Sequence, residues 1–400
     1  MRPPILSAAR ASSERSVRIA QTAVYYAGYA VIGLFAASLG PTLPGLADHT
    51  GSLLSGISFL FMARSFGYLL GSVLCGRLYD TLPAHTLMAG ALLVTAAMMA
   101  LTPAAYLLWV LTLVQLALGL SVSTLDIGVS TLLMWVHRDK SGAFMTAGHF
   151  FFGVGGLAAP VVIAHLTQLS GDINWPYWAL ALLILPIAGW VLSLPNPPRE
   201  VEAAQGEQPK GRARPSLVIL VSLFLFLYVG LESSFGGWIF TYAKTLGLGS
   251  DTTSAYLNSA FYGSFTVGCL VAVPLAARFR PRYILLGNLL GCLANLVIIL
   301  LWPGSRLALW VGTIGAGISV ASIFPVTLAL AQRRVAITAS VTGWFFAGAG
   351  AGGMFLPWLI GQLFESVGPQ VAMYGMVLDI LVALAVLALL VRHEPARAEN

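Results

Sequence analysis

The sequence predicts an all-α membrane protein in which twelve transmembrane helices form two pseudo-symmetric six-helix bundles. Of its 400 residues, 58% are hydrophobic and only 9% are charged, which is about a third of the charged share of an ordinary soluble domain. The mean hydropathy is +0.85. About twelve apolar runs follow one another, each close to the ~20 residues that a helix needs to cross a bilayer core.

The apolar runs can be placed along the chain. We expect spans near 20–46, 54–78, 86–106, 107–134, 143–167, 175–194, 216–243, 254–277, 283–302, 306–331, 336–364 and 370–391. The first run is too long for the core of a signal peptide, so we expect it to be a span. The connections are short except for a polar, Pro-rich and charged stretch. The predicted domains are an N-terminal bundle (1–194), a cytoplasmic linker (195–215) and a C-terminal bundle (216–400).

The basic residues predict the orientation. With both termini cytoplasmic, eighteen of the 21 Lys and Arg residues lie in cytoplasmic segments, Lys244 and Arg306 lie outside, and Arg64 lies within a span. Such an asymmetry is typical of membrane proteins. We therefore expect a multi-pass protein of a bacterial inner membrane with both termini cytoplasmic. The net charge of +6 follows from this topology and gives no reason to expect a nucleic-acid partner.

The two halves resemble each other in sequence. GLSVSTL (119–125) corresponds to GISVASI (317–323), and HFFFGVG (149–155) corresponds to WFFAGAG (344–350). A six-plus-six duplication with a central linker resembles the major facilitator superfamily, whose halves are parallel repeats. The resemblance covers the whole chain.

A short motif supports the same family. GSVLCGRLYD (71–80) resembles the Gly-x-x-x-x-Gly-Arg-x-x-Asp pattern between the second and third helices of that superfamily, although Thr81 and Pro83 depart from it. By this resemblance, the conformational motif consists of Gly71, Gly76, Arg77 and Asp80.

Five ionisable side chains fall within the predicted spans: Arg64, Asp126, His149, Glu232 and Asp379. Insertion scales charge about 2.5–3.5 kcal/mol for an Arg or Asp at a helix centre, so such groups usually face a cavity or a partner. We expect the first four to take part in ion coupling. Asp379 lies among apolar residues of the last helix, and we expect it to be structural.

Asp126 shares a helix face with Gly119, Ser123 and Ser130, because residues three, four and seven apart lie on one side of a helix. We expect this face to line a central cavity. Its repeat counterpart is Phe324, so packing shared by the halves does not explain the carboxylate. The alternative is a structural carboxylate satisfied by a nearby hydroxyl or Arg.

The depth of each ionisable residue in the membrane, counted along its helix, predicts two levels at which polar side chains meet. Counting at about 1.5 Å per residue places Asp126 near His149, and Arg64 near Glu232, with Arg64 as a countercharge. We expect Asp126 and Glu232 to face each other across the halves. Each has a structural alternative: an interhelical clamp for Arg64, a plain hydrogen-bonding role for His149 and an interhelical hydrogen bond for Glu232.

Candidate substrate groups combine amides or hydroxyls with flat aromatic faces, which suit a sugar. They are Trp238, Tyr228, Asn258, Tyr262, Gln115, Asn295, Trp344 and Phe345. Aromatic residues also fill cores and anchor helices at membrane interfaces, and Trp238 could be such an anchor.

Within the superfamily, the chain is similar to the sodium-dependent glucose transporters and the fucose/glucose–proton symporters. The similarity lies in LDIGVSTLLMWVHRDKSGAFMTAGHFFFGVGGLAAP (125–160), in YVGLESSFGGWIFTYA (228–243) and in GPTLPGLA (40–47). It implies that Asp126 belongs to the cation or substrate site, and that Glu232 and Trp238 belong to the substrate cavity. Unlike the fucose symporters, this chain has no acidic residue in YYAGYAVIGLFAASLG (25–40).

The predicted function is secondary transport of a sugar or similar small polar solute by alternating access, coupled to H⁺ or Na⁺. The alternatives are a proton-coupled exporter of amphipathic compounds and a non-transporting receptor. The sequence shows no nucleotide-binding loop, catalytic triad or metal-ligand cluster, so we expect no enzyme, no metal and no cofactor. We expect a monomer in the lipid bilayer, with a small molecule as its substrate.

Overall fold

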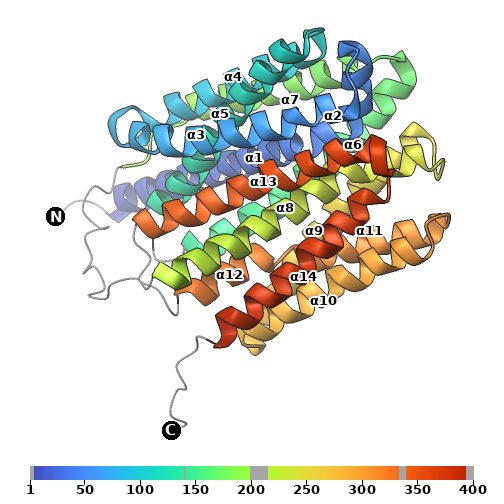
Figure 1. The fold of residues 1–400 in the computed structure, drawn as a ribbon. Helices are drawn as coiled ribbons and strands as arrows, with labels where there is room; N and C mark the ends of the chain where they lie inside the picture. Colours follow the sequence, from blue (N-terminus) through green and yellow to red (C-terminus); the bar gives the residue numbers. More distant parts are fainter. Residues whose placement is uncertain (1–3, 139–140, 199–214, 333–338, 393–400) are drawn as a thin grey trace.

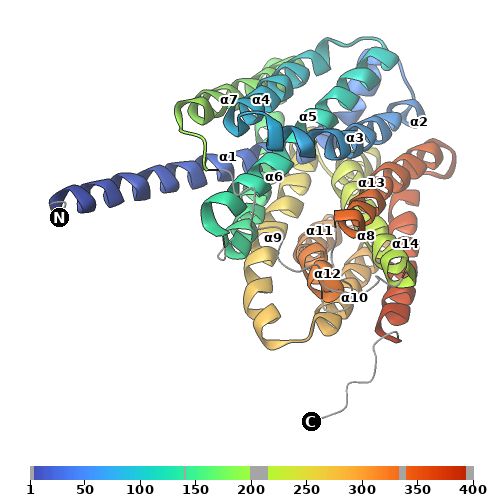
Figure 2. The same cartoon turned by 90° about the vertical axis from the view of Figure 1, so that its left-hand side faces the viewer.

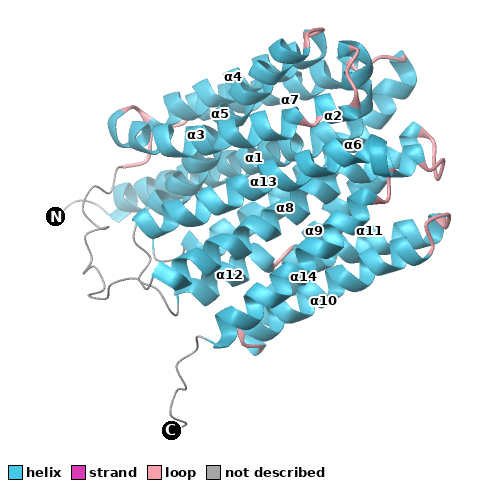
Figure 3. Cartoon of the chain, in the orientation of Figure 1, coloured by secondary structure: helices cyan, strands magenta, loops and turns pink. Residues whose placement is uncertain are grey.

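The computed structural model describes residues 4–138, 141–198, 215–332 and 339–392. This described part consists of helices joined by loops and turns, with no strand (Figure 3). Its apolar helices are long enough for twelve membrane spans. Because twelve crossings bring a chain back to the side on which it started, the first and last helices begin and end at the same end of the bundle (Figure 1).

The N-terminal half contains the first six spans. Its helices are α1 (Pro4–Thr50), α2 (Leu54–Ile57), α3 (Phe59–Thr81), α4 (Ala84–Leu101), α5 (Leu108–His137), α6 (Ser141–Ser170) and α7 (Asn174–Ser193), with a 3₁₀ turn η1 (Thr102–Ala104) after α4. The short α2 and α3 together make the second span.

The C-terminal half contains the other six spans. Its helices are α8 (Pro215–Thr245), α9 (Asp251–Arg278), α10 (Pro281–Leu301), α11 (Arg306–Val320), α12 (Ile323–Gln332), α13 (Ala339–Val367) and α14 (Val371–Arg392). Here the fourth span is divided into α11 and α12, whereas its counterpart α5 is one unbroken helix.

The predicted spans agree with these helices to within a few residues, except at the start. Helix α1 begins at Pro4, whereas we predicted a first span from about residue 20; its apolar span begins at Arg15. The linker lies largely outside the described residues. Its first residues are attached to the N-terminal half, since Gln21 donates to the Pro195 carbonyl (2.8 Å) and the His85 amide donates to Asn196 (2.8 Å).

The helices form two groups, which lie one above the other in Figure 2. Pairs that join the groups include α1 with α8, α3 with α13, and α6 with α9. Glycine permits close approaches between the groups. A Cβ on Gly40 of α1 would lie 2.3 Å from the carbonyl oxygen of Gly236 in α8, so a larger residue there would push the halves apart.

Candidate functional site: two buried carboxylates and a buried arginine

Asp126 lies in α5 and is bound from α3. The Tyr68 hydroxyl donates a hydrogen bond to its carboxylate. The two helices approach closely because glycines face backbone: a Cβ on Gly119 would lie 2.0 Å from the Arg64 carbonyl oxygen. The bond therefore joins two packed helices of the N-terminal half.

More hydroxyl groups surround Asp126. Tyr29 of α1 shares a hydrogen bond of 3.0 Å with Ser130 and interacts electrostatically with Asp126. His149 of α6 lies against the same tyrosine, with ring centroids 6.0 Å apart. Among the described residues, His149 makes no direct hydrogen bond to Asp126. Tyr29 therefore interacts with both Asp126 and His149, which we predicted to lie near each other.

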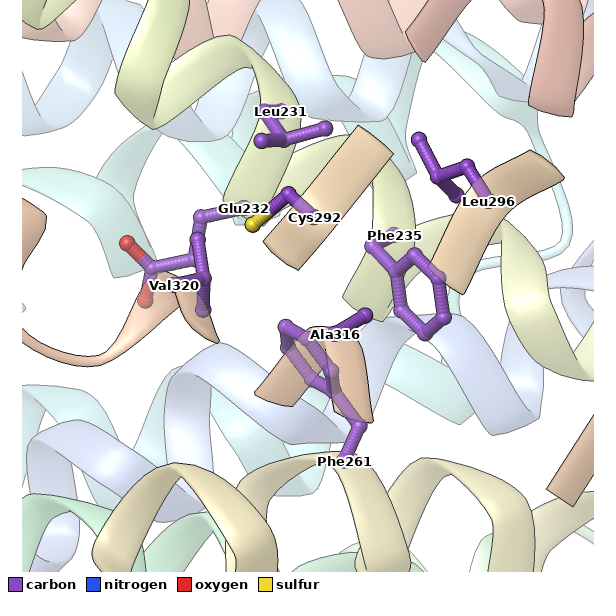
Figure 4. A pocket seen from close by; sticks show the side chains of 8 residues that line it. All are labelled: Leu231, Glu232, Phe235, Phe261, Cys292, Leu296, Ala316 and Val320. Carbon is purple, nitrogen blue, oxygen red and sulfur yellow. The ribbon is translucent and has the colours of Figure 1, made fainter. Parts of the chain in front are cut away.

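Glu232 lies in α8 and is bound within its own helix. The Tyr228 hydroxyl, one turn earlier, donates to its carboxylate. Glu232 also lines a small cavity inside the C-terminal half (Figure 4). The other lining residues are Leu231, Phe235, Phe261, Cys292, Leu296, Ala316 and Val320. Glu232 thus borders the interior of one bundle, whereas we predicted that it faces Asp126 across the halves.

Arg64 lies in α3 and is held by neutral groups. Its guanidinium donates to Gln115 (3.1 Å), to the Phe35 carbonyl (2.9 Å) and to Ser38 (3.2 Å), and it stacks on the Phe35 ring at 3.9 Å. No carboxylate of the described residues forms an ion pair with it. The predicted pairing of Arg64 with Glu232 is therefore absent here. Tyr262 of α9 is the link between them, since it interacts electrostatically with both.

The halves meet at the end of the bundle opposite the termini. Gln362 of α13 donates to the Ser55 carbonyl (2.7 Å) and to Ser58 (3.1 Å), and the Leu54 amide donates to Glu365 (2.9 Å). A Cβ on Gly361 would lie 2.2 Å from the Ser58 side chain. These contacts between the start of the second span and the end of α13 close that end.

Trp238 belongs to the same closed end. It is fully buried, stacks on Phe364 at 5.0 Å and donates to the Pro357 carbonyl at 2.9 Å. Phe61 of the other half lies 6.0 Å away. In this conformation Trp238 is thus packed between helices rather than open to a solute.

The other predicted substrate groups lie in several places. Gln115 is buried and orients Arg64. Asn258 is buried and donates to the Gly236 carbonyl at 2.5 Å, at the contact of α8 and α9. Asn295 donates to the Gly291 carbonyl of its own helix at 2.7 Å and packs against Gly315 of α11.

Two aromatic candidates from α13 point in different directions. Phe345 is 2% exposed and Trp344 is 64% exposed. Only Phe345 therefore packs inside the protein. Tyr228 and Tyr262 are buried beside Glu232. The predicted residues thus form two groups in the structure. One consists of Tyr228, Glu232 and Tyr262, and the other consists of Arg64 and Gln115.

Three members of the conformational motif, Gly76, Arg77 and Asp80, lie outside the residues whose side chains the structure describes. Gly71 is described, and a Cβ there would lie 2.7 Å from the Leu120 carbonyl oxygen. Asp379 is 7% exposed, and its Oδ2 has no hydrogen-bond partner among the described residues. No group of three or more His, Cys, Asp or Glu side chains that could hold a metal occurs in that part of the chain.

The sequence did not identify several partners of the carboxylates. Tyr68, Tyr29, Cys269 and Cys292 approach Asp126 or Glu232 from other helices. Tyr68 carried a weak signal, because it lies one helical turn after Arg64 on the same face. The cysteines carried none, since they look like small apolar residues.

Two six-helix halves that meet around buried polar groups define a polytopic membrane transporter. The family comparison makes this specific: the model described as Major Facilitator Superfamily matches residues 25–346 and 248–400. The chain belongs to this superfamily. The predicted family and fold are confirmed.

Relatives and solved structures agree with this assignment. The chain is 30% identical over 355 residues to sodium-dependent glucose transporter 1 of Xenopus laevis, covering 82% of this chain and 72% of that protein. It is 27% identical to the human protein of the same name, covering 84% and 72%. The xylose transporter XylE of E. coli, in a partially occluded inward-open conformation, has a similar fold (TM-score 0.77, 11% identity, 96% and 100% covered). So does the nucleoside transporter NupG (TM-score 0.76, 13%, 94% and 99%).

Proposed function

We propose that this protein moves a sugar or similar small polar solute across the membrane by alternating access, and that a gradient of H⁺ or Na⁺ drives it. In this mechanism the two bundles rock about a central site, and ion binding changes which side is open. Asp126 and Glu232 are the ion-responsive groups, and Arg64 with Gln115 supplies hydrogen-bond donors near the interface.

The observation that carries the proposal is the closure of one end of the bundle above buried polar groups. At the end away from the termini, Gln362 and Glu365 are hydrogen-bonded to the start of the second span, and Trp238 lies against Phe61 of the other half. With the termini cytoplasmic, this is a conformation closed to the outside. Charged groups inside a membrane are retained where they serve a pathway or a coupled ion.

The names of the relatives support the class of solute. Two of them are called sodium-dependent glucose transporters, so hexoses are the first solutes to test. These relatives are named as sodium-dependent, and one structural neighbour is named as a proton symporter. Na⁺ and H⁺ must therefore both be tested as the coupling ion.

The test uses the purified protein in liposomes. We expect radiolabelled D-glucose or D-xylose on one side to exchange for unlabelled sugar on the other without any ion gradient. An imposed Na⁺ or H⁺ gradient should then drive accumulation above equilibrium, and liposomes without protein give the baseline. If no sugar exchanges while a lipophilic cation is moved out against a proton gradient, the protein is an exporter of amphipathic compounds and the proposal is wrong.

A further inference from the structure

A larger cavity lies at the end of the N-terminal half where α1 and α6 begin and α5 ends. Its volume is about 720 Å³, and sites for small molecules typically have about 300–1,000 Å³. Most of its lining comes from α1, and His137 of α5 and Phe144 of α6 complete it. None of the described residues of the C-terminal half lines it. This cavity is therefore separate from the interface of the halves, where a transported solute would bind.

The cavity lies at the level where membrane spans begin and end. The first span begins at Arg15, the fourth ends at His137 and the fifth begins at Phe144. The span in α1 has 36 residues, whereas a helix crosses the hydrocarbon core in ~20 residues, so α1 is long enough for its first turns to lie among lipid headgroups. In Figure 2 the N-terminal part of α1 also projects beyond both groups of helices. The cavity thus lies at the membrane surface, on the side of the termini.

The outer part of the cavity is basic, and its side chains are held in place. Arg18 donates to the Val136 carbonyl at 2.7 Å, which uses one of the five N–H groups of a guanidinium. Thr22 donates to the Arg18 carbonyl, so its hydroxyl accepts from His137 Nε2 (2.7 Å each). Arg15 and Arg18 are exposed, and no described lining residue is acidic. The cavity therefore presents two guanidinium groups that its described lining does not neutralise.

The inner part of the cavity is apolar. Ile19, Ala23 and Tyr26 line it and share one face of α1, because residues three and four apart are neighbours on a helix. Tyr26 stacks on Phe151 of α6, with ring centroids 4.7 Å apart. From Arg15 to Tyr26 the helix advances about 16 Å into the membrane, at 1.5 Å per residue. Basic groups at the surface above an apolar wall suit an amphiphile with an anionic head, whereas a free phosphate would use only the basic part.

We propose that this cavity binds one anionic phospholipid of the leaflet on the side of the termini, which the basic residues predict to be cytoplasmic. The lipid phosphate accepts hydrogen bonds from Arg15 and Arg18, and the glycerol and upper acyl chains lie along Ile19, Ala23 and Tyr26. Arginine suits the geometry of phosphate, and basic pockets between transmembrane helices on the cytoplasmic side suit anionic headgroups. A bound lipid would contact α1, α5 and α6 together and so stabilise this end of the N-terminal half. The site goes beyond the proposed transport function and does not depend on it.

The test measures lipid binding to the purified protein after its lipids have been removed. The protein in detergent is titrated with dioleoylphosphatidylglycerol, and native mass spectrometry counts the bound lipids. We expect one lipid to bind more tightly than the others, and the double variant Arg15→Gln, Arg18→Gln to weaken this binding about ten-fold or more. The matched control is Arg278→Gln, Arg280→Gln, which removes two arginines at the same end of the C-terminal half and should bind as the wild type does.

Two further measurements separate a lipid from other ligands. Zwitterionic dioleoylphosphatidylcholine should not replace the tightly bound phosphatidylglycerol, and neither should an excess of inorganic phosphate. Ala23→Phe keeps both arginines but fills the apolar part, so it should also weaken binding, and it decides the case if the double variant does not fold. Wild-type binding in the double variant or in Ala23→Phe overturns the proposal. Displacement by phosphatidylcholine would show a site without charge selectivity, and displacement by phosphate would show a site for a soluble anion; either result also overturns it.

Discussion

The two halves each hold one membrane-embedded carboxylate beside a tyrosine, but they hold it differently. In the N-terminal half, Tyr68 and Asp126 lie on different helices, and further hydroxyl groups lie nearby. In the C-terminal half, Tyr228 and Glu232 lie one turn apart on a single helix, beside an apolar cavity. The tyrosine hydrogen bond of the first carboxylate depends on the packing of two helices, whereas that of the second is local to one helix. Duplicated helices therefore do not imply duplicated roles.

The counterpart of Asp126 sharpens this difference. Phe324 takes its place in the C-terminal repeat and lies 6.1 Å from Tyr228, ring to ring. The helix that carries Phe324 is broken two residues earlier, whereas α5 continues to His137. The N-terminal copy has an unbroken helix with a carboxyl group, and the C-terminal copy has a broken helix with an aromatic ring.

The largest effect is expected for Asp126→Asn. The amide oxygen can still accept from Tyr68, so the contact between α3 and α5 is retained, but the group can no longer gain or lose a charge. We expect at least a ten-fold loss of ion-driven sugar accumulation in liposomes, with exchange of labelled for unlabelled sugar retained. Uphill uptake at the wild-type level would show that Asp126 is structural.

The different surroundings of the two carboxylates predict a smaller effect, on the melting temperature, when their tyrosine partners are replaced. Tyr228→Phe removes the hydroxyl that donates to Glu232, and only two thiols and Tyr262 remain near this carboxylate. Tyr68→Phe, in contrast, leaves the hydroxyl groups of Tyr29 and Ser130 close to Asp126. A buried acceptor that loses its donor costs about 1–3 kcal/mol. We expect Tyr228→Phe to lower the melting temperature more than Tyr68→Phe in alkaline buffer.

Thermal unfolding followed by tryptophan fluorescence makes this measurement. The difference between the two variants should shrink in acid, because a protonated carboxyl group needs less solvation than an ionised one. Equal melting temperatures at every pH would mean that the two carboxylates have equivalent surroundings, contrary to the comparison above.

Much of the fold could be predicted because hydrophobic length is a local property. Runs of apolar residues gave all twelve spans, and the repeat GLSVSTL (119–125) against GISVASI (317–323) gave the two halves. The break of the fourth C-terminal span after Val320 was not predicted, although Pro325 accounts for it. Its ring lacks an N–H and clashes with the carbonyl four residues earlier, which is that of Ala321, and this carbonyl accepts from Cys269 instead. The early start of α1 was also not predicted, because Arg10 and Arg15 interrupt the apolar run without interrupting the helix.

The candidate site was predicted less completely. Asp126, Glu232 and Arg64 are conspicuous because charge is rare in a span, but their partners depend on helix rotation. A rotation of a few tens of degrees decides whether Glu232 faces the other half or its own bundle. Residue counting along the helix axis predicted Asp126 near His149 and Arg64 near Glu232. In the structure, Tyr29 interacts with both members of the first pair and Tyr262 with both members of the second.

A partly exposed loop carboxylate provides the reference for Asp126 and Glu232, with the smallest expected effect. Asp172 lies in the loop between α6 and α7, and hydrogen bonds from the Asn174 side chain and amide lower its pKa below the usual value. Such a group stabilises the folded state above the pKa of the unfolded chain and loses this contribution as the pH falls through its folded pKa. Asn174→Ala should therefore lower stability near neutral pH and lose this deficit in acid. Because the pair lies in a loop and is partly open to solvent, the deficit should stay below roughly 0.5 kcal/mol. Melting curves of the two proteins across acid and neutral pH make the comparison, and a deficit that grows in acid would contradict it.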